Sequence, residues 1–91
     1  MYARIATFEG AADIRGALAN VEQGGPPEGM KSSEAYFFAD SAAGKSVFVT
    51  FFETEEDYRR GDEVLSAMPA GETPGQRTSV ARYQVAFRMA D

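Results

Sequence analysis

Cysteine, histidine and tryptophan are all absent from this sequence of 91 residues. Without cysteine the chain has no disulfide, no thiol nucleophile and no cysteine-based zinc site, and this absence fits a reducing cytoplasm. Without histidine it lacks the commonest transition-metal ligand and the usual base of a serine or cysteine triad. Most familiar hydrolase chemistry is therefore excluded.

Basic residues and long apolar runs are also scarce. Nine Lys and Arg stand against 14 Asp and Glu, which gives a formal net charge of −5. Binding to nucleic acid draws on clustered Lys and Arg, so we expect no nucleic-acid partner. No apolar run approaches the roughly 18 residues of a membrane span, and the first residues do not resemble a signal peptide. We therefore predict a cytoplasmic protein with no membrane partner.

The composition that remains is that of an ordinary folded protein. Hydrophobic residues make up 44% of the chain and charged residues 25%, which are normal proportions for a globular domain. A chain of this length leaves much of its surface in water and gains stability from association. We predict a single domain over residues 1–91.

Hydrophobic patterns predict six secondary-structure elements. Four segments rich in β-branched, aromatic or alternating residues are predicted strands: 1–8, 35–39, 46–52 and 78–89. Apolar side chains at helical spacing predict a helix over 11–23, before a Gly-Gly-Pro-Pro run. Thr54, followed three residues later by Asp57, forms a capping box that starts a second helix, which ends before Pro69.

The order β-α-β-β-α-β within about 90 residues is the pattern of the ferredoxin-like α+β fold. In this fold a four-stranded antiparallel sheet carries both helices on one face. We assign that face to one alternating set of the third strand, namely Val47, Val49 and Phe51. We assign the opposite face to the other set and to aromatic residues of the second strand, namely Tyr36, Phe38, Phe48, Thr50 and Phe52. An uncovered apolar face of this kind predicts a homodimer joined sheet to sheet.

Four segments of the sequence carry a family resemblance: 2–10 (YARIATFEG), 36–46, 50–56 and 77–85. Together they resemble small proteins of the antibiotic-biosynthesis-monooxygenase-like group, which belongs to the dimeric α/β-barrel superfamily. The resemblance implies two ferredoxin-like sheets packed face to face, with helices outside and a ligand cavity between sheet and helices or inside the barrel. Characterised members include cofactor-independent monooxygenases that act on polyphenolic or quinone-like substrates, and haem-degrading enzymes.

The sequence departs from the haem-degrading members of this group. Those members resemble one another in an Asn, Trp and His set, whereas this chain has neither Trp nor His, and its only Asn, Asn20, lies outside the apolar stripe of its helix. Phe52 occupies the position where many relatives have a Trp, so the indole N–H donor is lost. We expect no haem degradation and no cofactor, and the sequence identifies no catalytic residue.

Seven residues form the candidate ligand cavity. The aromatic members would enclose a planar ligand in a dry pocket, and the arginines would bind an anionic or phenolate group. The structural alternatives are a plain dimer core for the aromatics and ion pairs at strand ends for the arginines. The acidic run at 53–57 is explained by helix capping and the helix dipole, so we predict no metal site. The seven are Arg4, Tyr36, Phe38, Phe48, Thr50, Phe52 and Arg82.

Two functions remain open at this stage. The first is a homodimeric protein that binds a small aromatic molecule, with or without a weak cofactor-independent monooxygenase activity. The alternative is a non-catalytic dimerisation or regulatory module, which predicts a closed core without a cavity.

Overall fold

The secondary-structure elements occur in the predicted order, β-α-β-β-α-β. The strands form one antiparallel sheet with the spatial order β2-β3-β1-β4, as in a ferredoxin-like α+β fold. The computed structural model describes residues 1–10, 14–25, 27, 29–68 and 74–89. The elements are β1 (Tyr2–Glu9), α1 (Ile14–Gly24), β2 (Glu34–Asp40), β3 (Lys45–Phe52), α2 (Glu55–Ser66) and β4 (Gln76–Gln84).

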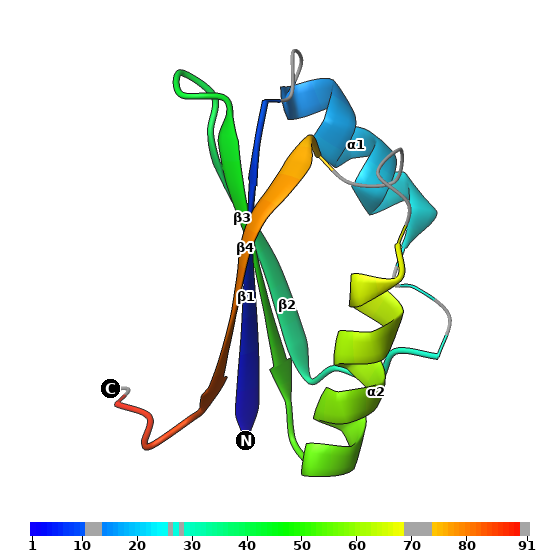
Figure 1. Cartoon of the computed structure of the whole chain (residues 1–91), viewed down its shortest axis with the longest axis vertical. Helices are drawn as coiled ribbons and strands as arrows, with labels where there is room; N and C mark the ends of the chain where they lie inside the picture. Colours follow the sequence, from blue (N-terminus) through cyan, green and yellow to red (C-terminus); the bar gives the residue numbers. More distant parts are fainter. Residues whose placement is uncertain (11–13, 26, 28, 69–73, 90–91) are drawn as a thin grey trace.

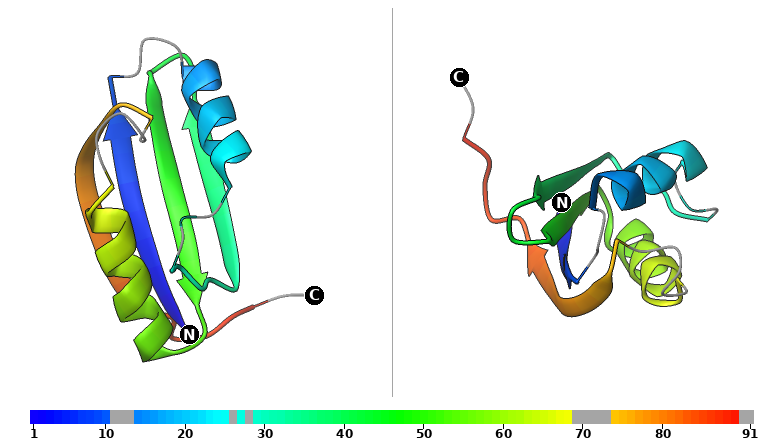
Figure 2. Two further views of the ribbon diagram at one scale, coloured as in Figure 1. Left: turned by 90° about the vertical axis from the view of Figure 1, so that its right-hand side faces the viewer. Right: turned by 90° about the horizontal axis from the view of Figure 1, so that it is seen from above.

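Both helices lie on the same face of the sheet, as Figure 1 shows. Viewed onto that face, α1 covers the β2 side and α2 covers the β1 side (Figure 2). We call this the helix-covered face and the other the open face. Neither helix of the described chain has the length and apolar character that crossing a membrane requires.

The start of α2 confirms Thr54 as the N-cap of the predicted capping box. Thr54 has extended backbone angles, and its side chain accepts a hydrogen bond of 3.1 Å from the backbone N–H of Asp57. Three acidic residues occupy the first turn, where the helix dipole favours negative charge. This cap sets where α2 begins, and therefore which of its residues face the sheet.

A hairpin joins β2 to β3. The Asp40 carboxylate accepts a hydrogen bond of 3.2 Å from the backbone N–H of Ala43. Gly44 then takes a positive φ of 66°, which lets the chain enter β3 without steric strain. The two strands pair antiparallel from Glu34 opposite Phe51 to Asp40 opposite Lys45.

The last strand is shorter than predicted. β4 ends at Gln84, so the prediction of a strand up to residue 89 is wrong. Gln84 lies opposite Tyr2, the first residue of β1, and Val85 donates the final backbone hydrogen bond to Met1. Beyond that point β1 offers no further partner, and an isolated strand has no ladder to join. The predicted first turn of the first helix, 11–13, lies outside the described residues.

The assignment of sheet faces for β3 is wrong. Phe52, Thr50 and Phe48 lie opposite Tyr2, Arg4 and Ala6, and opposed residues share a face. α2 contacts this set, because Arg4 bonds to Asp62 and the ring of Phe52 lies against Gly61. The set predicted for the open face is therefore helix-covered, and Val47, Val49 and Phe51 lie on the open face. Only Tyr36 and Phe38 are on the open face as predicted, opposite Val49 and Val47.

The most buried side chains gather where α2 crosses the central strands. Ala6 and Phe52 are fully buried, and Phe8 and Leu65 nearly so. By contrast, none of the described side chains of α1 is buried. The core is therefore tight under α2 and loose under α1, and this difference positions the candidate site.

Candidate ligand cavity

A cavity of about 940 Å³ lies between the helix-covered face and the two helices. Its volume falls within the range of small-molecule sites, roughly 300–1,000 Å³. Most of its lining is apolar and comes from β-strands, both helices and the loop that follows α1. The main apolar lining residues are Phe8, Phe37, Phe48, Leu18, Val21, Pro27, Met30, Leu65 and Met68.

The sheet side of the cavity is a pair of stacked aromatic rings. Phe37 of β2 lies opposite Phe48 of β3, and their ring centroids are 4.2 Å apart with an interplanar angle of 11°. Ring stacking favours a fixed arrangement of the two side chains. On the other side, Leu18 and Val21 of α1 are spaced to face the sheet. The sheet side of the cavity is therefore aromatic, and we call Phe37 and Phe48 its aromatic floor. The side formed by α1 is aliphatic.

One end of the cavity is formed by Arg4, whose side chain is only 2% exposed. Its Nε donates to Asp62 Oδ1 at 2.8 Å, and its Nη2 donates to Ser66 Oγ at 3.3 Å. Arg82, opposite Arg4 on β4, donates from Nε to Asp62 Oδ2 at 3.1 Å. One carboxylate on α2 thus joins two arginines from neighbouring strands.

The titration of this cluster follows from its contacts. Partial burial alone would raise the pKa of the Asp62 carboxyl, but hydrogen bonds from Arg82 and Arg4, and their charges, outweigh burial and hold the pKa below its usual value. Burial raises the pKa of the Tyr58 hydroxyl, and the charge of Asp62 adds to this, while both arginines oppose it. Asp62 is therefore ionised and Tyr58 neutral at neutral pH.

A second aromatic cluster packs α2 against β1 and β3. Tyr58 of α2 stacks on Tyr2 with ring centroids 5.4 Å apart, and it meets Phe52 edge to face at 5.9 Å. Gly61, one turn further along α2, leaves room for the Phe52 ring. This cluster is packed core, so Phe52 supports α2 instead of forming a wall of the cavity.

Two buried hydroxyl groups on the helix-covered face lack a hydrogen-bond partner among the described residues, those of Ser46 and Thr50. Thr50 lies between Ala35 and Arg4 in the register of the sheet, and both neighbours line the cavity. An unpaired buried hydroxyl is unfavourable by about 1–3 kcal/mol. The Thr50 hydroxyl is therefore an unpaired hydrogen-bonding group next to Arg4 and Ala35 of the cavity lining.

The structure brings together only part of the predicted site. Arg4, Tyr36 and Phe48 line the cavity, although the Tyr36 ring stacks on Phe38 on the open face at 6.1 Å. Thr50 is buried next to Arg4, as described above. Phe38 is 57% exposed on the open face, away from the cavity.

Phe52 and Arg82, the remaining two predicted site residues, serve the packing of α2. Phe52 contacts Gly61 and Tyr58, and Arg82, with its side chain 47% exposed, pairs with Asp62. The sequence contained no sign that one carboxylate would serve two arginines. The capping box at Thr54 nevertheless fixes the phase of α2, and that phase could have placed Asp62 toward β1.

Sequence reasoning also missed Phe37 and Arg77 as cavity-lining residues. The signal for Phe37 was its alternation with Tyr36 and Phe38, which puts it on the other face of β2. Arg77 follows the turn that leads into β4, and its Nη1 donates to the backbone carbonyl of Leu65 at 3.4 Å. No group of three or more metal-ligating side chains occurs within the described parts of the chain.

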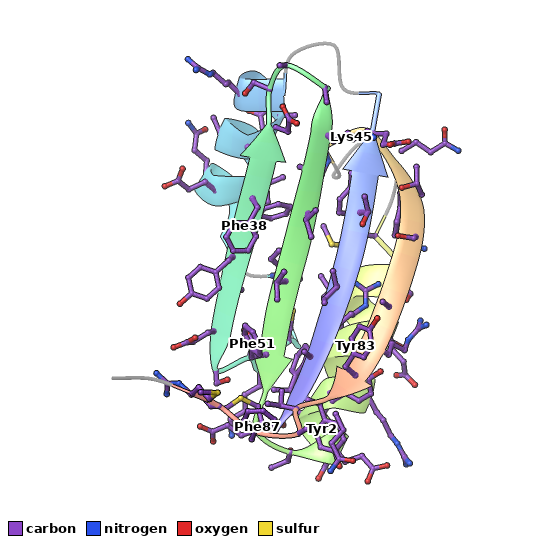
Figure 3. The ribbon with its side chains drawn as sticks, turned by 90° about the vertical axis from the view of Figure 1, so that its left-hand side faces the viewer. Tyr2, Phe38, Lys45, Phe51, Tyr83 and Phe87 are labelled. Carbon is purple, nitrogen blue, oxygen red and sulfur yellow. The ribbon has the colours of Figure 1, made fainter. Side chains whose placement is uncertain are left out.

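The open face of the sheet is largely apolar. Apolar side chains from all four strands reach it, and Figure 3 shows Phe38, Phe51 and Tyr83 spread across it. Phe87 is 74% exposed in the segment after β4, which leaves the sheet on this side (Figure 1). A charged pair on this face, Lys45 with Glu9 at 3.1 Å, lies at the strand ends.

These features define a small α+β domain of the ferredoxin-like type, with a cavity beneath its helices and an apolar open face. No protein-family model matches the sequence, and no curated protein matches it either.

Proposed function

We propose that this chain binds a small aromatic or apolar molecule in the cavity under α1 and works as a homodimer joined through its open face. The observation that carries the proposal is the cavity, which combines about 940 Å³ of volume with an aromatic floor and one charged end. Sites for small molecules combine apolar walls with a few placed polar groups in this way.

The loose packing of α1 supports binding over a purely structural role. A module that served only dimerisation would gain stability from closing α1 onto the sheet, since each buried CH₂ contributes about 0.8 kcal/mol. Leu18 and Val21 instead remain partly exposed above Phe48. A bound apolar molecule would cover these side chains.

Dimerisation is supported by the composition of the open face. Tyr36, Phe38 and Tyr83 are each about half exposed on it, and an exposed apolar surface of this kind marks an association site. A second copy of the chain is the occupant we propose, because an identical apolar face is complementary to it and two such sheets would close into an α/β barrel. The cofactor-independent monooxygenase activity that the family resemblance implies stays a prediction.

Ligand binding is tested with 2-naphthol as the probe. We expect nuclear Overhauser effects from its ring protons to the methyl groups of Leu18 and Val21. The variant Ala17→Trp places an indole into the lining and should weaken binding by at least about tenfold, since the added ring occupies the ligand's volume. Ala19→Trp, an identical change on the exposed side of α1, should leave affinity unchanged. Equal affinity in both variants, or no binding to the wild type, would contradict the proposal.

The dimer is tested by size-exclusion chromatography with light scattering at micromolar concentration. We expect twice the mass of one chain for the wild type and a single-chain mass for Val49→Lys, because a charge in the middle of the open face would be buried unpaired. Ala19→Lys, on an exposed helix surface, should stay dimeric. A wild-type protein that elutes as a monomer would refute the dimer.

A further inference from the structure

Two arginines of the cavity lining bond to the last turn of α2. Arg4 of β1 and Arg77 of β4 both line the cavity. Arg4 donates to the side chain of Ser66, and Arg77 donates to the carbonyl of the preceding residue, Leu65. Two cations from neighbouring strands therefore converge on adjacent residues of one helix.

The charges at this end of the cavity do not cancel within the described residues. Asp62 is the carboxylate that pairs with both Arg4 and Arg82, so one negative charge faces two positive ones. Arg77 bonds to a neutral carbonyl and has no carboxylate partner in the part of the chain that the structure describes. Glu22 is the acidic residue of the described cavity lining, and it is exposed to water, as Arg77 is, so the charges of both are partly screened.

The excess of positive charge at this site contrasts with the net charge of −5 of the whole chain. Arg4, Arg82 and Arg77 together carry three positive charges against the one negative charge of Asp62, and this balance favours an anion, since charge-assisted hydrogen bonds are about twice as strong as neutral ones. The Arg4 side chain is almost completely buried, so such a bond would form in a low-dielectric setting. Its planar fork also suits a carboxylate.

We propose that the ligand of this cavity is an apolar organic acid. Its hydrophobic body lies on Phe37 and Phe48 under Leu18, and its single anionic group is held by Arg77 together with Arg4. This inference rests on the proposed function, because it assigns a chemical class to the ligand of the same cavity.

The test compares 2-naphthoate with its neutral analogue 2-naphthalenemethanol by isothermal titration calorimetry at pH 7. We expect the wild type to bind the acid about tenfold more tightly, the size of one charge-assisted hydrogen bond. Arg77→Gln should remove this preference while leaving the affinity for the alcohol unchanged. Arg77→Lys should retain it, since the positive charge remains.

Arg60→Gln is the matched control, because it removes the same charge from an exposed position on α2. It should keep the tenfold preference. If the wild type binds acid and alcohol equally, the acid assignment is overturned while the cavity remains a binding site. If Arg77→Gln keeps the preference, the placement of the anionic group at Arg77 is overturned. If neither compound binds, the proposed function fails as well.

Discussion

Replacing Asp62 by Asn is expected to lower the free energy of unfolding by about 3–5 kcal/mol, because it leaves the buried Arg4 without its counter-charge. Small domains are stable by only about 5–15 kcal/mol, so the loss would be a large share of the total. The measurement is urea unfolding followed by circular dichroism, at one fixed protein concentration because the proposed dimer would add to apparent stability.

The control for this prediction is Arg82→Gln, which removes the other arginine from the same carboxylate. The Arg82 side chain is 47% exposed, so its ion pair is screened by water and its loss should be below about 1 kcal/mol. The difference between the two losses of stability separates the contribution of the buried Arg4–Asp62 pair from that of the exposed Arg82–Asp62 pair. Equal losses in the two variants would show that burial of Arg4 does not matter.

The substitution Asp62→Asn should also change how the stability of the protein depends on pH. The pKa of Asp62 is lowered in the folded state, so its contribution is fully present above its unfolded value of about 3.9. That contribution is lost as the pH falls below this value and through the folded pKa. The wild type should therefore lose stability below about pH 4, and Asp62→Asn should lose less over this range. An identical pH profile in both proteins would contradict the predicted role.

Replacing Gly61 by Ala is expected to destabilise the protein by about 1–3 kcal/mol through overpacking. A methyl group at this position would run into the Cε1 and Cζ atoms of Phe52, whose side chain is fully buried and held against Tyr58. In an open helix the same change would stabilise by up to about 1 kcal/mol, because Gly is a poor helix former. The sign of the effect therefore reports the contact between α2 and β3.

Two variants make this prediction sharp. Gly24→Ala, where an added methyl group has no atom within 4 Å, should leave stability the same or slightly higher. In a Phe52→Leu background, Gly61→Ala should change from destabilising to neutral or stabilising, since the ring atoms are gone. A loss of the same size in both backgrounds would mean that Phe52 is not the cause. Thermal unfolding of the wild type, Gly61→Ala, Phe52→Leu and the double variant measures this coupling.

The order of the elements could be predicted because it depends on local signals. Strand propensity, the Thr54 cap and the turn at Gly44 each act within a few residues, and the structure contains all three. The family resemblance implied a cavity, but the residues alone could not determine where it lies or which side chains line it. The cavity exists because α1 stands away from Phe37 and Phe48, and that distance depends on how segments far apart in sequence pack together.

The faces of β3 show most clearly where the sequence stopped being sufficient. Both alternating sets of this strand are apolar, so hydrophobicity alone could not decide which set lies under the helices. The sequence by itself determined six elements, a four-stranded sheet and an apolar surplus on both of its faces. Only the tertiary structure decided that Phe52 lies inward, because Gly61 is the position on α2 with space for its ring and Asp62 beside it pairs with Arg4.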